Sequence, residues 1–585
     1  MTTTGQIRIN EQTSRLALTP ITVWNAVVPV SCLPPEILAY IFVYCAQRCY
    51  DENLDGHTGV PEWVNVSHVC SRWRHVALNC PTMWSYMFVA SPRWTDVSLI
   101  RSKEVPLRIR VDFSLHREMA LEFMEQVAPH AERFRECLID LQILDTKFVL
   151  PMLSERSAPL LHTLVITFSH ILNQRNEVDV DLEVEYDVFN TTYAVGPHTL
   201  FNGDTPALRE LHLSDYVTSW CSPTLSGLTV LRLRDLHYSV RPTIAELRVI
   251  LSRMPDLERL YLENAIRGGL YDPAALDAEK VHLPRLAHFL ITAPFSRLLW
   301  FLSSIDIPAT TQVRLGCRLE TNLNADDFAP FYAFLSRRFG NSENEARPIR
   351  SMLATGSSHR RLVIAFSASK HTCGLQRCNT LLHEDCGCDT PLKVEIDWRS
   401  QPEHWKRLTV GICCSVPLAH LINLIVNHCR LPSALWSDVF WHLQKLLYIE
   451  LVGGDFLDIL TALLLSFPPL PENAARPPDQ PTNKLFAPSL EALYLNGVKV
   501  PRNIRCGGNP NIHGRHAMLF LAALARRKAA GHGLIHLIIN GNFSFSQKEL
   551  ARLEQVVAQV VLHRFARFLP EDESCEDCKG EVPEE

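Results

Sequence analysis

One short leucine pattern recurs along this chain and constrains its fold more than any other feature. The template L-x-x-L-x-L occurs as "PALRELHL" at 206–213, "PDLERLYL" at 255–262 and "PSLEALYL" at 488–495. Its last two leucines flank a single residue, which indicates a short strand buried on one face. The proline before the template ends any preceding helix, because it lacks a backbone N–H. Five further copies are "PLLHTLVI" at 159–166, "LSGLTVLRL" at 225–233, "PRLAHFLI" at 284–291, "KLLYIEL" at 445–451 and "GLIHLII" at 533–539.

Between these strands the apolar period changes to that of a helix. The segment "TIAELRVILSRM" at 243–254 opens with Thr243 and Glu246 in the spacing of a capping box. It then places Leu247 and Leu251 on one face. Strand–helix units of this size cannot bury their own apolar faces, so they must stack on their neighbours. These units resemble leucine-rich repeats, and they predict a mixed α/β chain with an irregular strand–helix solenoid and a parallel sheet over residues 150–568.

The repeats depart from the regular leucine-rich pattern at one position. Regular repeats carry Asn or Cys three places after the last strand leucine, whereas Tyr216, Ala265 and Val498 stand there. The repeats are also unevenly spaced, with early starts at 208, 228, 257 and 286 and late ones at 446, 490 and 534. The polar ladder that makes regular repeats curve evenly is therefore not expected. An ordinary α/β core with leucine-bearing strands is the alternative interpretation.

Charge and composition exclude several classes of protein. The chain has 63 acidic against 57 basic residues and a net charge of −6, so no overall positive field exists to hold nucleic acid. Of the two most apolar windows, 289–305 contains Pro294 and Arg297, and 455–467 is too short to span a bilayer, so no membrane contact is expected. The first 30 residues do not read as a secretory signal, and the 18 cysteines are scattered. Reduced thiols in the cytosol or the nucleus are expected.

Several segments flank or interrupt the array. An N-terminal extension covers 1–29, a linker and the start of the repeats cover 91–149, and an acidic tail covers 569–585. "EVDVDLEVEYDV" at 177–188 alternates acidic with apolar residues, which favours an edge strand or hairpin with one buried face. A flexible acidic insertion that attracts a basic partner is the alternative. The proline-rich residues 468–484 are expected as a surface loop.

Residues 31–88 carry two apolar helices that are too short to bury each other. The first, within "LPPEILAYIF" at 33–42, begins at two prolines, where a missing N–H costs nothing, and Glu36 suits its first turn. Its apolar stripe is Ile37, Leu38, Ile41, Phe42 and Cys45. The second helix carries Val66, Val69, Cys70, Trp73, Val76 and Ala77, and Trp84 follows as a large anchor. The unburied remainder of these apolar faces is predicted to be a docking surface.

Residues 30–90 carry three motifs in this order: L-P-x-E-I-L-x-x-I-F, V-C-x-x-W-x-x-V-A and P-x-x-W. With these motifs, residues 30–90 resemble an F-box. F-boxes fold as a small three-helix module that docks on the Skp-family adaptor of cullin–RING ubiquitin ligases. One departure is the polar segment 46–62, which is longer than the compact link of that family and bears on the fit to the adaptor. The resemblance implies adaptor contacts from Leu33, Pro34, Ile37, Leu38, Ile41, Phe42, Val69, Cys70, Trp73 and Trp84.

The resemblance implies a substrate-recognition subunit of an SCF-type ubiquitin ligase, whose solenoid binds a protein target that the sequence does not identify. The phosphate-loop, H-E-x-x-H and G-x-S-x-G motifs are absent from the sequence, so no catalytic residue, cofactor or enzymatic activity is expected. Two alternatives remain, an F-box scaffold that acts outside a ligase and a metal-stabilised protein-binding module.

The metal alternative depends on one cysteine-rich stretch, "HTCGLQRCNTLLHEDCGC" at 371–388. Its thiols and imidazole are ligands that zinc prefers, yet the spacing lacks the paired C-x2-C of common zinc modules. No bound metal is therefore expected. The candidate ligands are Cys373, Cys378, His383, Cys386 and Cys388.

Overall fold

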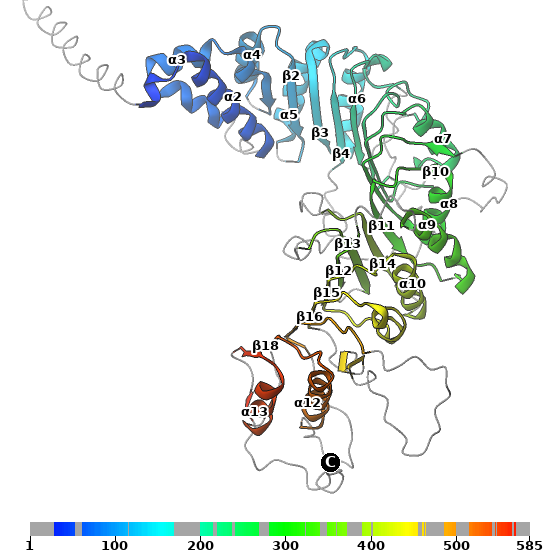
Figure 1. Cartoon of the computed structure of the whole chain (residues 1–585). Coiled ribbons are helices and arrows are strands. Elements are labelled where there is room, and N and C mark those ends of the chain that lie inside the picture. Colours follow the sequence, from blue (N-terminus) through cyan, green and yellow to red (C-terminus); the bar gives the residue numbers. More distant parts are fainter. Residues whose placement is uncertain are drawn as a thin grey trace, which may run out of the picture. The chain divides into compact units, whose positions relative to one another are not determined.

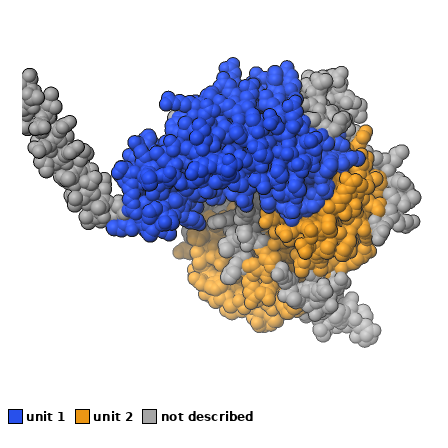
Figure 2. All heavy atoms as spheres, turned by 90° about the horizontal axis from the view of Figure 1, so that it is seen from above, with its two compact units in different colours: residues 1–240 blue, residues 241–585 orange. Residues whose placement is uncertain are grey.

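The structure is a computed structural model, and the elements that it places are drawn in colour in Figure 1. The chain divides into two compact units, Met1–Val240 and Arg241–Glu585 (Figure 2). Among the helices that the structure describes, none is long and apolar enough to cross a membrane. The described residues are 29–52, 61–89, 91–114, 116–168, 199–214, 219–236, 240–267, 280–321, 323–339, 348–357, 360–370, 389–398, 402–453, 459–460, 462–463, 485–498, 514–540, 544–545, 547–563 and 567–568.

Unit 1 begins with helices and continues as alternating strands and helices. Its α-helices are α2 (Pro35–Glu52), α3 (Ser71–Leu78), α4 (Pro92–Ser102), α5 (Arg117–Val127) and α6 (Thr146–Ser154). Its 3-10 helices are η1 (Pro29–Cys32), η2 (Glu62–His68), η3 (Pro81–Ser85), η4 (Ala128–Arg133), η5 (Ile143–Asp145) and η7 (Leu200–Gly203). Its strands are β1 (Tyr86–Phe88), β2 (Leu107–Asp112), β3 (Phe134–Leu141), β4 (Thr163–Phe168), β5 (Glu210–Ser214) and β6 (Val230–Arg234).

The six strands of unit 1 pair in chain order, and every pair is parallel. In β2, Leu107, Ile109 and Val111 are buried, and the residues between them are only partly buried. Helix α5 packs against β2, and α4 and α6 flank α5. The three leucine templates of this unit form β4, β5 and β6, as predicted. The parallel ladder also includes β2 and β3, so it extends into the residues expected to hold a linker and the first repeats.

Unit 2 contains the other five templates, which form β7, β9, β16, β17 and β18. Its helices are α7 (Ile244–Ser252), α8 (Phe295–Ser304), η10 (Ala325–Phe328), α9 (Ala329–Phe339), α10 (Pro402–Ser415), η13 (Leu435–Val439), η14 (Phe440–His442), α12 (Gly514–Ala529) and α13 (Gln547–Val556). Its strands are β7 (Arg259–Glu263), β8 (Val281–His282), β9 (His288–Pro294), β10 (Ile305–Asp306), β11 (Gln312–Arg318), β12 (Ser351–Ser357), β13 (Arg361–Ser367), β14 (Leu392–Asp397), β15 (Asn423–Asn427), β16 (Tyr448–Val452), β17 (Ala492–Asn496), β18 (His536–Asn540), β19 (Ser544–Phe545), β20 (Gln559–Leu562) and β21 (Arg567–Phe568).

The predicted capping box also forms in unit 2. The Thr243 hydroxyl accepts a hydrogen bond from the Glu246 amide at 3.2 Å, and the Glu246 carboxylate accepts one from the Thr243 amide at 2.8 Å. Together they satisfy two of the amides that every helix start leaves without a partner. Leu247 and Leu251 are buried on one face of α7, as the spacing predicts. The predicted fold class, a mixed α/β chain with an N-terminal helical module and a mostly parallel sheet, is confirmed.

The main sheet of unit 2 is parallel except at one place. The strands run β7, β9, β11, β14, β13, β12, β15, β16, β17, β18 and β20. Strand β13 is antiparallel to both of its neighbours, which the leucine pattern did not predict. The reason lies in the connection between β12 and β13, which is only residues 358–360. A link this short can join only antiparallel strands, whereas a parallel crossover needs a dozen residues or more.

Three neighbouring strands of unit 2 end in a repeated turn. The first residue after β15, β16 and β17 has a positive φ, 48° at His428, 63° at Gly453 and 58° at Gly497. The amides of the two glycines donate to the last residue of the next strand, Gly453 to Asn496 at 2.8 Å and Gly497 to Asn540 at 2.5 Å. The ladder of hydrogen bonds thus continues one residue past the strands.

We expect Gly453→Ala to lower the free energy of unfolding of unit 2 by about 2–3 kcal/mol. A side chain at this φ is strained by roughly 1–2 kcal/mol, and its Cβ would overlap the imidazole of His428. Gly497→Ala is the control, because it has a similar φ and open space around the new Cβ. Urea unfolding should therefore show a smaller loss for Gly497→Ala, and equal losses would contradict the role of the His428 contact.

A short polar ladder exists, but not at the position where regular leucine-rich repeats carry theirs. Ala265 and Val498, three places after the last strand leucine, are buried apolar residues. Asn496 and Asn540 directly follow the last apolar residues of β17 and β18. The Asn540 side-chain amide donates to the Asn496 side-chain carbonyl at 3.0 Å. Tyr216 lies outside the described residues. The leucine-rich-repeat likeness itself stays a prediction.

Three buried arginines hold helix ends to the loops that lead into strands. Arg133 at the end of η4 donates to the Val105 carbonyl at 2.9 Å, just before β2. Arg338 in the last turn of α9 donates to the Pro308 carbonyl at 2.9 Å, just before β11. Arg527 in the last turn of α12 is fully buried. Burial lowers the pKa of Arg338 and of Arg527 to about 10, so both guanidinium groups remain charged at neutral pH.

Candidate functional site

The N-terminal helices of unit 1 form a small module with its own core. Leu38, Phe42, Ala46 and Tyr50 are buried at intervals of one helical turn along α2. They belong to a core that also holds Trp63, Val64, Val76, Ala77, Cys80, Met83, Trp84, Tyr86 and Phe88.

Tryptophan side chains tie the pieces of this core together. The rings of Trp63 and Trp84 meet edge to face at 5.0 Å, and the Trp84 indole N–H donates to the Ala77 carbonyl at 2.9 Å. The Phe42 and Trp73 rings lie 5.1 Å apart. These contacts hold η3 against α3, and α3 against α2.

The second predicted helix is shorter than its apolar pattern indicated. The residues from Val66 to Ala77 divide between η2, which ends at His68, and α3, which begins at Ser71. The break occurs because Cys70 has an extended backbone, with φ −157° and ψ 170°. Its sulfur caps the helix by accepting a hydrogen bond from the Trp73 amide at 3.5 Å. The module therefore has two α-helices with short 3-10 helices around them, rather than three full helices.

The ten residues predicted to contact an adaptor separate into three groups. Leu38 and Phe42 are 0% exposed and Trp84 is 2% exposed, so they pack inside the module. Leu33, Cys70 and Trp73 are half-buried, and Pro34 is exposed. Ile37 is 47% exposed, Ile41 37% and Val69 60%.

Two exposed aromatic residues escaped the sequence prediction. Tyr40 is 75% exposed and Tyr44 is 63% exposed. With Ile37 and Ile41 they occupy successive turns on the outside of α2, at the i, i+3, i+4, i+7 spacing of one helix face. We call these four residues the outer stripe. Its signal in the sequence is that α2 carries more apolar residues than a single buried face can hold.

The module is continuous with the sheet of unit 1. Strand β1, the last element of the module, pairs in parallel with β2 and aligns Phe88 with Arg110. The Tyr50 hydroxyl near the end of α2 donates to the Ile109 carbonyl at 3.2 Å, and Arg110 donates to the Tyr50 carbonyl at 2.5 Å. Burial raises the pKa of Tyr50, which keeps the phenol protonated and able to donate.

The predicted metal candidates belong to the cysteine-rich stretch 371–388. Cys373, Cys378, His383, Cys386 and Cys388 lie outside the described residues, as do the predicted edge strand 177–188 and the acidic tail. Elsewhere, within the part of the chain that the structure describes, no three His, Cys, Asp or Glu side chains are grouped to hold a metal ion.

Of three comparisons with known proteins, one matches this module. A search of curated proteins found no match. A solved structure, "Crystal structure of Rad7 and Elc1 complex in yeast", aligns with 87% of this chain and 96% of its own at 10% identity, with a TM-score of 0.21. A likeness at that score supports no conclusion about the fold. A family model, F-box-like, matches residues 30–90, the same boundaries that the motif indicates. The chain therefore carries an F-box-like domain at residues 30–90.

Proposed function

We propose that this protein binds an Skp-family adaptor of a cullin–RING ubiquitin ligase through residues 30–90 and presents a protein target held by its strand–helix array. The outer stripe is the observation that carries the proposal. Four large apolar side chains stand on one exposed helix face of a domain whose family match is to F-box-like modules. Fully burying such a side chain contributes about 1.5–3 kcal/mol, so a hydrophobic groove that covers the stripe would bind it well.

The proposal gives the chain no chemical step of its own. Ubiquitin transfer would belong to partner subunits, and the F-box-like domain would only join target to ligase. The buried side chains of Leu38, Phe42 and Trp84 would pack in the core and hold α2 in position. The outer stripe and Val69 would contact the adaptor. The Arg72 guanidinium donates to the Leu33 carbonyl, and this bond holds the start of α3 beside the residues that precede α2.

We expect Ile37→Asp to weaken adaptor binding by about 100-fold without unfolding the domain. A carboxylate forced into an apolar groove costs several kcal/mol, and about 1.4 kcal/mol is already tenfold in affinity. The fold should survive because the Ile37 side chain is half exposed in the free protein. Calorimetry with purified adaptor measures the affinity, and circular dichroism checks the fold.

Ile100→Asp is the matched control for this test. Ile100 lies on α4, is 76% exposed and stands outside the F-box-like domain, so the same replacement should leave adaptor affinity unchanged. Normal affinity of a folded Ile37→Asp protein would refute the outer stripe as the contact. Recovery of the adaptor without a cullin in a pull-down would favour the scaffold that acts outside a ligase.

A further inference from the structure

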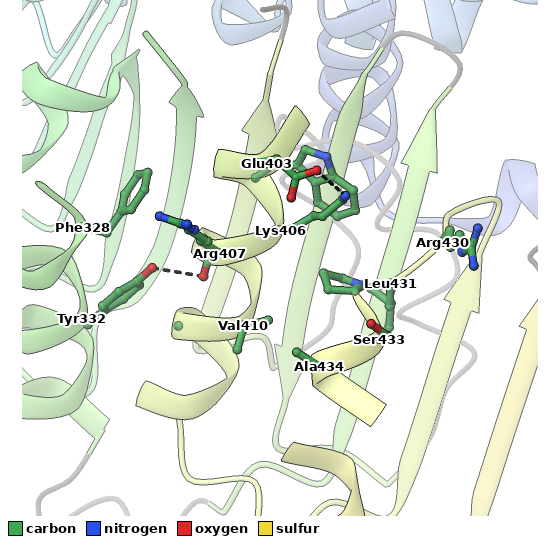
Figure 3. Close-up of a pocket in the computed structure, with 13 residues that line it drawn as sticks. Phe328, Tyr332, Glu403, Lys406, Arg407, Val410, Arg430, Leu431, Ser433 and Ala434 are labelled. Atoms are coloured by element: carbon green, nitrogen blue, oxygen red, sulfur yellow. Dashed lines mark hydrogen bonds and ion pairs between the residues drawn. The ribbon is translucent and has the colours of Figure 1, made fainter. Parts of the chain in front are cut away.

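A large hollow opens on the helical side of unit 2, far along the chain from the F-box-like domain. Its volume is about 890 Å³, within the range of ligand pockets in proteins. Helices α9 and α10 and the segment 430–434 line it (Figure 3). We call it the basic hollow and define it by Phe328, Tyr332, Trp405, Lys406, Arg407 and Arg430.

The walls of the basic hollow are aromatic and are held in place by packing. The Tyr332 ring lies directly over Gly411 of α10, where any Cβ would overlap it. The Tyr332 hydroxyl donates to the Arg407 carbonyl at 3.1 Å, as Figure 3 shows. On α10, Trp405 stacks on Trp398 with ring centroids 4.7 Å apart. The hollow thus offers preformed apolar surfaces for a bulky side chain.

The charge of the basic hollow is opposite to that of the chain. Among the described residues, Lys406, Arg407 and Arg430 line it with one carboxylate, Glu403, whereas the chain has a net charge of −6. Glu403 is already paired with the Lys406 ammonium at 2.7 Å. The Arg407 guanidinium has no acceptor among the described residues, and Figure 3 shows it on the same side of α10 as Phe328. Burial raises the pKa of Tyr332 to about 12, so its phenol adds no negative charge.

We propose that the basic hollow binds an acidic segment of a separate protein, with a bulky apolar residue between its carboxylates. Arginine matches a carboxylate through two parallel hydrogen bonds, and the aromatic walls would take the apolar side chain. The proposal deepens the proposed function, because such a segment would belong to the protein target. Nucleic acid fits less well, since the cations are gathered in one hollow of an acidic chain rather than along a track.

The test measures binding of a fluorescent peptide of glutamates around one central phenylalanine to the full chain. We expect Arg407→Glu to weaken binding at least about tenfold, and Arg552→Glu to leave it unchanged. Arg552 is exposed on α13 of the same unit, so it controls for the change in net charge. No measurable binding to the wild-type chain, or equal binding by both variants, would overturn the proposal.

Two further measurements separate an apolar pocket from a simple charge effect. Val410 lines the hollow, and Val410→Trp should weaken peptide binding several-fold by filling space without changing charge. Thermal unfolding checks that each variant is folded. Equal affinity for a peptide with glycine in place of phenylalanine would overturn the apolar contact. Tighter binding of an oligothymidylate, lost in Arg407→Glu, would overturn the acidic segment in favour of nucleic acid.

The last arm tests whether the occupant is this chain itself, since residues 569–585 are strongly acidic. The triple substitution Glu571→Gln, Asp572→Asn and Glu573→Gln in the full chain should leave peptide affinity unchanged. A gain of tenfold would identify the tail as the occupant and overturn binding of a separate protein. Adaptor affinity, measured on the same Arg407→Glu protein, should stay normal, so a failure of the hollow and a failure of the F-box assignment give different results.

Discussion

Arg527→Met should lower the free energy of unfolding of unit 2 by about 3 kcal/mol. The Arg527 guanidinium donates to the Phe486 carbonyl at 2.5 Å and to the Ala487 carbonyl at 2.9 Å. Hydrogen bonds from a charged donor contribute roughly 1.5–3 kcal/mol each, and the change would leave both carbonyls buried without these donors. Part of the loss is offset, because methionine has no charge to desolvate.

Urea unfolding followed by tryptophan fluorescence measures this effect, since Trp436 lies 6.2 Å from Phe486 between ring centroids. The adjacent Arg526→Met is the control. Arg526 is exposed on the same turn of α12, and exposed substitutions usually change stability by less than about 0.5 kcal/mol. Equal losses for the two variants would show that the carbonyl contacts do not stabilise the unit.

Phe42→Ala should lower the free energy of unfolding of the F-box-like domain by about 3–5 kcal/mol. The Phe42 side chain is fully buried against Trp73, and removal of a buried phenylalanine leaves a cavity that the neighbours fill only in part. Adaptor binding would fall with it, but through unfolding and not through a lost contact.

Ile41→Ala distinguishes these two causes. Ile41 is adjacent in sequence and partly exposed on the outer stripe, so its truncation should cost less than about 1 kcal/mol of stability and still reduce adaptor affinity. Near-ultraviolet circular dichroism of the core tryptophans reports the fold, and calorimetry reports the affinity. Phe42→Ala and Ile41→Ala proteins of equal stability would contradict the placement of Phe42 in the core.

The leucine templates predicted eight strands because the information for each strand is local. An apolar residue followed by an alternating pair describes a strand with one buried face, whatever the rest of the chain does. Strands without the template, such as "SMLATGS" at 351–357 and "RLVIAFS" at 361–367, were not predicted. Their identity depends on pairing with each other and with β14 and β15, which no short window contains. The division of the chain after residue 240 is likewise a property of distant contacts.

The outer stripe shows the same limit at the level of single side chains. Helical periodicity places Ile37, Leu38, Ile41 and Phe42 on adjacent faces of one apolar helix. Which face is buried depends on where α3 and η3 pack, and those elements come dozens of residues later. The basic hollow could not be predicted for a similar reason, since it joins residues from 328 to 434.

The pairing of β1 with β2 determines how this chain could be divided for experiments. A transplant of residues 30–90 would remove β1 and leave the N–H and C=O groups of β2 open along the new sheet edge. Such bare edges recruit strands from other chains, which leads to aggregation. A chimera should therefore leave residues 86–88 with the sheet, so that β2 keeps its partner strand. The transplanted domain then needs two apolar residues in place of Tyr86 and Phe88 to cover its core.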